Sequence, residues 1–123
     1  MTNLFRDQEK FMRACDQTTG EFNNQQLTLY LNLIREEYDE LMQANQEDDR
    51  LEMLDALIDI LVVTIGAIHS AGFDAEGAWR EVMSTNFAKV DRETGKVRKR
   101  EDGKVLKPTG WHPPVLSPYL SKK

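Results

Sequence analysis

Residues 56–68 read A-L-I-D-I-L-V-V-T-I-G-A-I, an almost wholly apolar run that carries one carboxylate, Asp59. The run is well short of the roughly 20 residues that a helix needs to span a bilayer, so it predicts a helix buried in a protein core. A carboxylate in such a helix is costly unless it is hydrogen-bonded, neutralised or bound to a metal. Asp59 is therefore the first candidate functional residue.

Length and composition are those of a single globular domain. The chain has 123 residues, of which 40% are hydrophobic and 30% charged. One cysteine, Cys15, excludes an intramolecular disulfide and any cysteine-cluster zinc site. The first ten residues are polar and lack the apolar centre of a signal peptide, so we expect a cytoplasmic protein that does not enter a membrane.

Charge is distributed unevenly along the chain, whose net charge is −5. Residues 1–88 hold 6 Lys/Arg against 17 Asp/Glu, a net −11, whereas residues 89–107 hold 8 against 4, a net +4. A general nucleic-acid binder would usually show a dominant basic patch, so we expect no nucleic-acid partner. The pattern suits a polyanion held by a metal on one side and by lysines on the other, and equally a solvated basic tail.

Apolar periodicity and capping residues predict an all-α fold, a bundle of four to five helices. The helices are expected over residues 3–17, over 25–45, from the acidic segment 46–49 to about residue 70, and from 74 towards 86–90. The helix expected over residues 25–45 carries an apolar stripe formed by Leu27, Leu31, Ile34, Tyr38 and Leu41.

The C-terminal part changes character. Turn signals at residues 94–95 and 102–103 favour a small hairpin or an ordered loop within a basic, irregular segment. Three prolines then predict an extended tail. We therefore expect one all-α domain over residues 1–110 and a tail over residues 111–123.

Two predicted helices each present an acidic face. Glu37 and Glu40 share a face with Glu36 on its flank, and the next helix carries Glu52, Asp55 and Asp59 at steps of three and four. Two antiparallel helices joined by a short loop would set these faces opposite each other. Such acids repel one another unless cations hold them together.

All-oxygen ligation suits Mg²⁺, with Mn²⁺ as a substitute. A di-iron bundle would need Glu-x-x-His pairs. The residues three before the two histidines are Gly66 and Thr109, so that rival lacks its ligands. A solvated acidic face, or a non-enzymatic helical module that binds a basic partner, is the alternative interpretation.

Four stretches in order carry a resemblance to a known family. They are L-I-R-E-E-Y-D-E-L (33–41), D-A-L-I-D-I-L-V-V (55–63), S-T-N-F-A-K (84–89) and D-G-K-V-L-K-P (102–108). The chain resembles the MazG-like all-α nucleoside triphosphate pyrophosphohydrolases, a superfamily that includes phosphoribosyl-ATP pyrophosphohydrolase and the dimeric dUTPases. The resemblance implies Mg²⁺-dependent hydrolysis between the α- and β-phosphorus, giving a monophosphate and pyrophosphate.

The resemblance also implies a ligand set. It places Mg²⁺ on Glu37, Glu40 and Asp59, with Glu36 as a further ligand or as the base that activates water. The family usually has a glutamate three residues before the aspartate, where this chain has Ala56. We assign the fourth ligand to Asp55, which shares a face with Asp59, and keep Glu52 as the alternative. Glu36 and Glu37 are the candidate catalytic residues.

Substrate contacts are expected in both halves of the chain. The candidates are Asn86 for a base edge or ribose, Lys89 for a phosphate, the weaker Lys104 and Lys107, and for the base Phe11, Gln17 and Trp111. Each of the last three also fits an ordinary core or surface role.

The expected substrate is a surplus or non-standard deoxynucleoside triphosphate, as in nucleotide-pool house-cleaning, with phosphoribosyl-ATP as the alternative. Apolar residues on more than one helix side, including Leu29 and Leu33, predict a homodimer or homotetramer.

Overall fold

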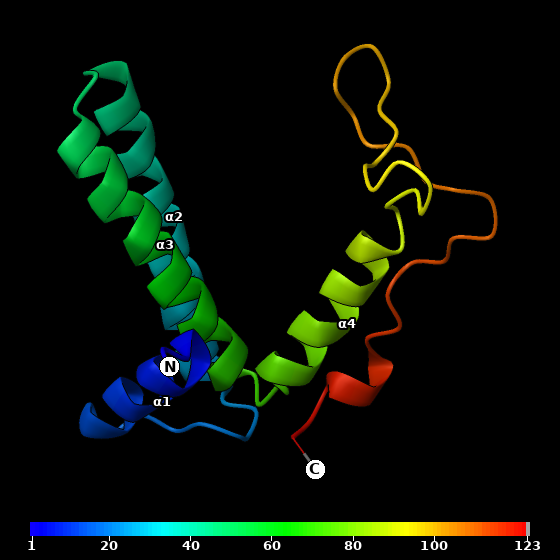
Figure 1. The fold of residues 1–123 in the computed structure, drawn as a ribbon. Helices are drawn as coiled ribbons and strands as arrows, with labels where there is room; N and C mark the ends of the chain where they lie inside the picture. The colour runs from blue at the N-terminus through cyan, green and yellow to red at the C-terminus, as the bar shows by residue number, and fades with distance from the viewer. Residues whose placement is uncertain (123) are drawn as a thin grey trace. The chain divides into compact units, whose positions relative to one another are not determined.

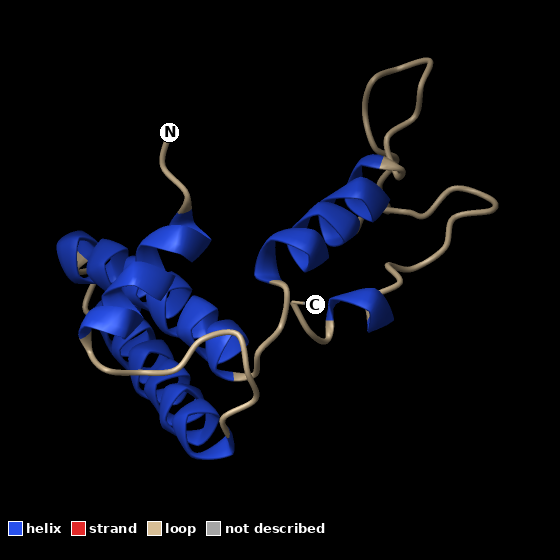
Figure 2. Cartoon of the chain, turned by 90° about the horizontal axis from the view of Figure 1, so that it is seen from below, coloured by secondary structure: helices blue, strands red, loops and turns tan. Residues whose placement is uncertain are grey.

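The computed structural model describes residues 1–122 and is all-helical (Figures 1 and 2). No β-strand occurs in these residues, which confirms the all-α prediction. The elements are α1 (Leu4–Ala14), α2 (Asn24–Gln46), α3 (Arg50–Ser70), α4 (Ala75–Phe87) and a short 3-10 helix, η1 (Ser117–Tyr119). Within residues 1–122 no helix combines the length and apolarity that crossing a membrane requires.

Helix ends follow local capping chemistry. The Asn23 side chain accepts a hydrogen bond from the N–H of Gln26 at 3.0 Å, and Asp49 accepts one from Glu52 at 3.1 Å, which satisfies free donors at the starts of α2 and α3. The first helix ends three residues earlier than predicted. Asp16 takes a φ of 59°, a left-handed conformation that stops the helix.

The chain divides into two compact units. One comprises Met1–Ala75, joined by the C-terminal residues from Leu120, and the other comprises Glu76–Tyr119. The predicted division at residue 110 stays a prediction.

In the first unit α2 and α3 form an antiparallel hairpin whose register is defined by two contacts (Figure 1). The side-chain N–H of Gln26 donates to the Ser70 hydroxyl at 2.8 Å. One turn further along, the Tyr30 ring lies so close to Gly66 that a Cβ there would overlap with it. Residue numbers rise by four on α2 and fall by four on α3 between these contacts, which fixes the antiparallel register.

The core of this unit lies along the same contact line. Met12 from α1 is fully buried and clusters with Tyr30, Val63 and Ala67, and Leu33 packs against the cluster. The predicted α2 stripe is only partly buried: Leu31 is 52% and Tyr38 53% exposed. The reason is that α2 meets α3 through a face that mixes polar and apolar residues, about 80° around the helix from that stripe.

The connection between α1 and α2 is tied to the end of α3. The N–H of Asn23 donates to the Ser70 carbonyl at 2.7 Å, and Gln26 bonds to the backbone of Thr18 in both directions, at 2.8 and 3.0 Å. Gly72, at the predicted end of α3, has a φ of 76°, and a Cβ there would lie 2.7 Å from the Glu21 carbonyl carbon. The chain therefore enters α2 against the segment that leaves α3.

The second unit begins with α4 and continues as an ordered loop. Isolated antiparallel bridges join Val90 to Val97 and Lys99 to Val105, so the basic segment forms a loop with two bridged turns and no regular hairpin strands. The tail is not uniformly extended as predicted, since η1 interrupts it. The indole N–H of Trp111 donates to the Thr85 carbonyl at 2.8 Å, which attaches the tail to α4.

Candidate active site

The helix register places the two central acids opposite each other. Seven residues beyond Tyr30 is Glu37, and seven residues before Gly66 is Asp59, so both lie two turns along the same contact line. Glu37 and Asp59 are partly buried, whereas Glu36, Glu40, Glu52 and Asp55 are exposed. The hairpin thus holds one carboxylate of each helix at its interface with further acids at the rim.

Glu37 has the most perturbed environment of these acids. Burial, a hydrogen bond with Glu40 and the charges of Glu40, Asp59 and Asp55 raise its pKa from 4.5 to about 7. Its Oε2 atom is buried and has no hydrogen-bond partner among residues 1–122. A buried carboxylate oxygen without a partner is costly. The site would therefore gain from a cation or a proton there.

Asp59 is perturbed in the same direction. Burial raises its pKa first, followed by the charges of Asp55 and Glu40. Glu37, Glu40, Asp55 and Asp59 therefore act on one another across the two helices. Of the two alternatives for the fourth ligand, Asp55 is the one whose charge raises the pKa of both Glu37 and Asp59.

The carboxylates lie close to one another, but they do not form a coordination sphere. Among residues 1–122, no three His, Cys, Asp or Glu side chains are placed as ligands of one ion. The donor set nonetheless fits a hard cation, because it consists of carboxylate oxygens and includes the unpartnered Glu37 Oε2. Ala56 is buried at 3% exposure and faces Glu40 in the same register, so no carboxylate occupies that position.

Four of the predicted substrate residues meet in the second unit. Lys89 donates to the Asn86 side-chain oxygen at 3.1 Å, and the ammonium groups of Lys89 and Lys107 lie 5.1 and 4.8 Å from the centroid of the Trp111 ring. Lys104 is exposed in a turn, where its backbone N–H bonds to Asp102.

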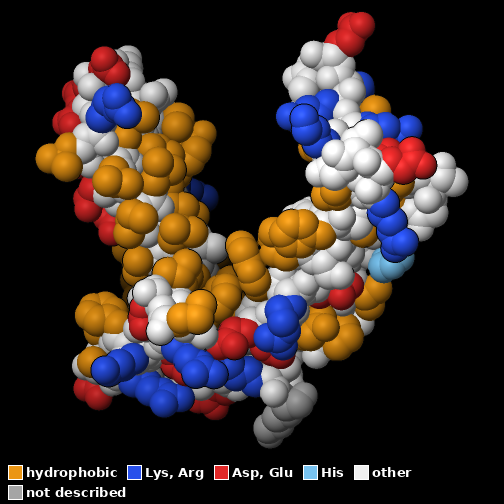
Figure 3. All heavy atoms as spheres, viewed as in Figure 1, with side chains coloured by type: hydrophobic (Ala, Val, Ile, Leu, Met, Phe, Trp, Pro, Cys, Tyr) orange, Lys and Arg blue, Asp and Glu red, His pale blue; other side chains and the backbone are white. Residues whose placement is uncertain are grey.

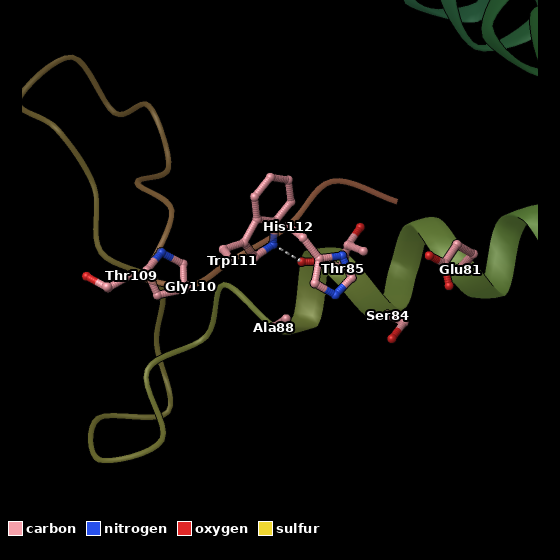
Figure 4. Close-up of a pocket in the computed structure, with 9 residues that line it drawn as sticks. Glu81, Ser84, Thr85, Ala88, Thr109, Gly110, Trp111 and His112 are labelled. Carbon is pink, nitrogen blue, oxygen red and sulfur yellow. Dashed lines mark hydrogen bonds between the residues drawn. The ribbon is translucent and has the colours of Figure 1, made fainter. Parts of the chain in front are cut away.

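A pocket of about 330 Å³ opens beside Trp111 (Figure 4). Periodicity could not predict it, because its second wall comes from the irregular residues 108–112. It is lined by Glu81, Ser84, Thr85, Ala88, Pro108, Thr109, Gly110, Trp111 and His112.

The two predicted base contacts on the first unit have different environments. Gln17 accepts a hydrogen bond from the Tyr30 hydroxyl, so part of its hydrogen-bonding capacity is used within the fold. Phe11 is 60% exposed on α1. Their roles in binding stay predictions. Buried Gln8, which hydrogen-bonds Tyr30, was not predicted because one polar residue in an amphipathic helix carries no periodic signal.

The matching family model is that of phosphoribosyl-ATP pyrophosphohydrolase, and it covers residues 5–86, about two thirds of the chain. The chain belongs to this family. The match includes both helices of the carboxylate hairpin and α1 from its second residue onward, and it ends within α4, before Lys89. A comparison with curated proteins found no match.

Membership of the phosphoribosyl-ATP pyrophosphohydrolase family agrees with the resemblance to the MazG-like superfamily, as does the all-helical fold. It assigns the chain to the pyrophosphohydrolases, hydrolases that split a phosphoanhydride bond. The family is named after one substrate, phosphoribosyl-ATP, and the match does not distinguish that substrate from a nucleoside triphosphate.

Proposed function

We propose that this protein is a Mg²⁺-dependent pyrophosphohydrolase that cleaves a nucleoside or deoxynucleoside triphosphate between the α- and β-phosphorus, as a house-cleaning enzyme of the nucleotide pool. The observation that carries the proposal is the buried, unpartnered Oε2 atom of Glu37 amid three other carboxylates. Mutual repulsion and burial make this cluster unfavourable by itself, and a divalent cation would compensate both effects.

Glu37, Glu40, Asp55 and Asp59 would hold the metal, with Glu36 and Glu52 at the rim. Mg²⁺, or Mn²⁺ in its place, would supply charge neutralisation for the phosphates and acidify a bound water. Glu36 is exposed beside Glu37 and would accept the proton of the attacking water. Asn86 and Lys89 would contact substrate, with Lys104, Lys107, Gln17, Phe11 and Trp111 as further contacts.

Phosphoribosyl-ATP is the second candidate substrate, and the family match supports it equally. The deciding experiment incubates the protein and Mg²⁺ with canonical and modified triphosphates and with phosphoribosyl-ATP, and measures pyrophosphate against orthophosphate. Turnover of a triphosphate that exceeds turnover of phosphoribosyl-ATP supports the proposal. The reverse order selects the second candidate.

A non-enzymatic acidic interaction module predicts that neither metal nor Asp59 matters for any turnover. We expect Asp59→Asn to lower kcat by about 100-fold or more, since metal ligands contribute several kcal/mol to the transition state. The matched control is Asp39→Asn, an exposed acid of the same helix hairpin outside the cluster. Pyrophosphate release that survives EDTA and Asp59→Asn would contradict the enzymatic proposal.

The protein is further proposed to assemble as a homodimer, with a tetramer as the larger alternative. Large apolar side chains remain exposed along the hairpin (Figure 3). Of the two residues away from the main stripe that led to the prediction of self-association, Leu33 packs on the core and Leu29 is exposed. The exposed set on α2 and α3 comprises Leu29, Leu31, Tyr38, Met42, Leu51, Leu54, Leu57, Ile58 and Leu61, and an apolar surface of that extent marks an interaction site.

A further inference from the structure

The turn at residues 99–105 contains a dipeptide with a reactive backbone. Asp102 is followed by Gly103, and both residues are exposed. In an Asp-Gly sequence the glycine nitrogen can attack the aspartate side chain, because glycine has no Cβ that would obstruct the approach. A Cβ built on Gly103 would meet no atom within 4 Å, so the rest of the structure leaves this approach open as well.

The reaction consumes and releases only water. The backbone nitrogen of Gly103 forms a bond to Cγ of Asp102, while the bond between Cγ and one carboxyl oxygen breaks. That oxygen leaves as water with the carboxyl proton and the proton of the Gly103 amide, and a cyclic succinimide remains. Water then adds to either carbonyl of the ring and opens it. One opening restores aspartate, and the other gives isoaspartate, in which the main chain runs through Cγ.

Ring closure requires a protonated carboxyl, because a carboxylate oxygen is a poor leaving group. In the folded protein the carboxylate form is stabilised. The Arg100 guanidinium donates to both carboxylate oxygens of Asp102, with Nε 3.1 Å from Oδ1, and the backbone N–H of Lys104 donates to Oδ1 at 3.1 Å. The hydrogen bond from Arg100 is the main reason that the pKa of Asp102 is lowered. The reactive, protonated form is therefore rare.

The attacking nitrogen is also held in place. The N–H of Gly103 donates to the Arg100 carbonyl at 2.9 Å, and the N–H of Arg100 donates to the Lys104 carbonyl at 2.8 Å. An antiparallel bridge between Lys99 and Val105 closes the turn. A hydrogen-bonded amide is less available for attack, since it must give up this proton to close the ring. Arg100 thus restrains both reacting groups, one through its side chain and one through its carbonyl.

We infer that the Asp102-Gly103 bond is a site of spontaneous isomerisation to isoaspartate and that Arg100 protects it in the folded protein. Among residues 1–122, Arg100 is the only cation of segment 89–107 in an ion pair. Isomerisation adds one atom to the main chain between Arg100 and Lys104, where two backbone hydrogen bonds close the turn, so the turn would lose its register. The inference involves neither a metal nor a nucleotide and does not rest on the proposed function.

The test follows isoaspartate at residue 102 in the full chain by digestion, chromatography and mass spectrometry. At about pH 6 an aspartate is protonated only to a small extent, so the rate follows the protonated fraction. We expect Arg100→Gln to raise the rate about two- to fivefold, the range expected for the loss of an exposed ion pair. The matched control is Arg98→Gln, which removes the same charge from an exposed residue that forms no ion pair within residues 1–122 and should keep the wild-type rate.

Three further measurements separate the ion pair from other effects. Arg100→Lys keeps the charge but loses the planar two-point contact, so its rate should lie between those of wild type and Arg100→Gln. In concentrated urea the wild type should isomerise faster than in the folded state, because the ion pair and the turn are absent. Asp102→Glu should form far less product at this position, since its longer side chain would have to close a larger ring. Far-UV circular dichroism checks that each variant remains helical.

Three results would overturn the inference. Equal rates for Arg100→Gln and Arg98→Gln in the folded state would show that the ion pair gives no protection. A wild type that isomerises as fast when folded as in urea would show that the turn gives none. Isoaspartate at an unchanged level in Asp102→Glu would place the reaction at another residue. None of these results depends on whether the protein hydrolyses a nucleotide, so the inference and the proposed function are tested separately.

Discussion

The Glu37 side chain has a buried oxygen without a hydrogen-bond partner, and the side chains around it carry the same negative charge. Asp59 is partly buried too, whereas Glu36, Glu40, Glu52 and Asp55 are exposed, where water can stabilise their charge. The spacing of the acids in the sequence was enough to predict this cluster. It could not reveal which acid would be most perturbed, because that depends on the depth at which α2 and α3 meet. The sequence also could not reveal that Ala56 would be buried opposite Glu40, because that depends on the register between α2 and α3.

Replacing the buried charge should stabilise the metal-free protein. At pH 8, Glu37→Gln should raise the free energy of unfolding by about 1 kcal/mol, because it replaces a partly buried carboxylate with a neutral amide of similar size. The gain stays small because water partly reaches the side chain and already stabilises its charge. Thermal unfolding in EDTA measures it. Stabilisation of the wild type by added Mg²⁺ should be lost in the variant. Glu36→Gln, an exposed neighbour, is the control and should change little.

The raised pKa of Glu37 makes stability depend on pH. Between about 4.5 and about 7 the folded state holds a proton that the unfolded state has released. The stabilisation is therefore complete below pH 4.5 and is lost as pH rises through 7. We expect the unfolding free energy of the metal-free wild type, minus that of Glu37→Gln, to fall over this interval. A difference that stays flat from pH 5 to pH 8 in denaturant titrations would contradict the assignment.

At the scale of the element, the α2–α3 hairpin brings the two acidic faces together. Apolar periodicity predicted both helices and nearly all of their ends. The predicted apolar stripe of α2 is borne out only in part, since Leu27 and Ile34 pack on the core whereas Leu31 and Tyr38 are exposed. Gln26 and Tyr30 also lie on the face that packs, and they do not stand out in a hydrophobic pattern. The actual register depends on a close approach, Tyr30 against Gly66, and on the bond from Gln26 to Ser70.

Adding one methyl group at that approach should disturb both stability and the site. Gly66→Ala places a Cβ into the Tyr30 ring, so we expect a loss of about 1–3 kcal/mol, typical of overpacking. Tyr30→Leu removes the ring atoms that would overlap, and the cost of Gly66→Ala should be smaller in that background. Chemical denaturation of the four proteins gives the coupling energy. Costs that simply add would show that the ring does not limit the approach.

For the whole molecule, the sequence predicted self-association from apolar residues that one chain could not cover. The single chain does leave many of them exposed, although Leu33 is packed. Exposed apolar residues indicate that a surface could be covered by another copy of the chain, but they do not indicate the number of subunits. The ordered contacts of residues 108–112 with α4 were also beyond prediction, since they depend on one indole finding the Thr85 carbonyl.

Charges placed in the apolar surface should dissociate the assembly. Wild type should scatter light as a dimer or larger, and Leu54→Lys with Leu61→Lys should reduce it to a species near 14.2 kDa. Both residues are exposed in the single chain, at 59% and 48%, so the fold should survive the change. The control adds the same charge to the polar side of α2, as Gln25→Lys with Asn32→Lys. A wild type that is already monomeric at micromolar concentration would refute the association.

The bond from Asn23 to the Ser70 carbonyl has a consequence for how the molecule opens. The hairpin is closed at one end by the short link between α2 and α3, and at the other by this bond and by the tight passage of Glu21 over Gly72. A helix pair fastened at both ends cannot fray from a free tip. Its amide protons should therefore exchange with solvent together, in one cooperative opening. Under the proposed function, we expect the metal to bind and leave at the rim while the hairpin backbone stays closed.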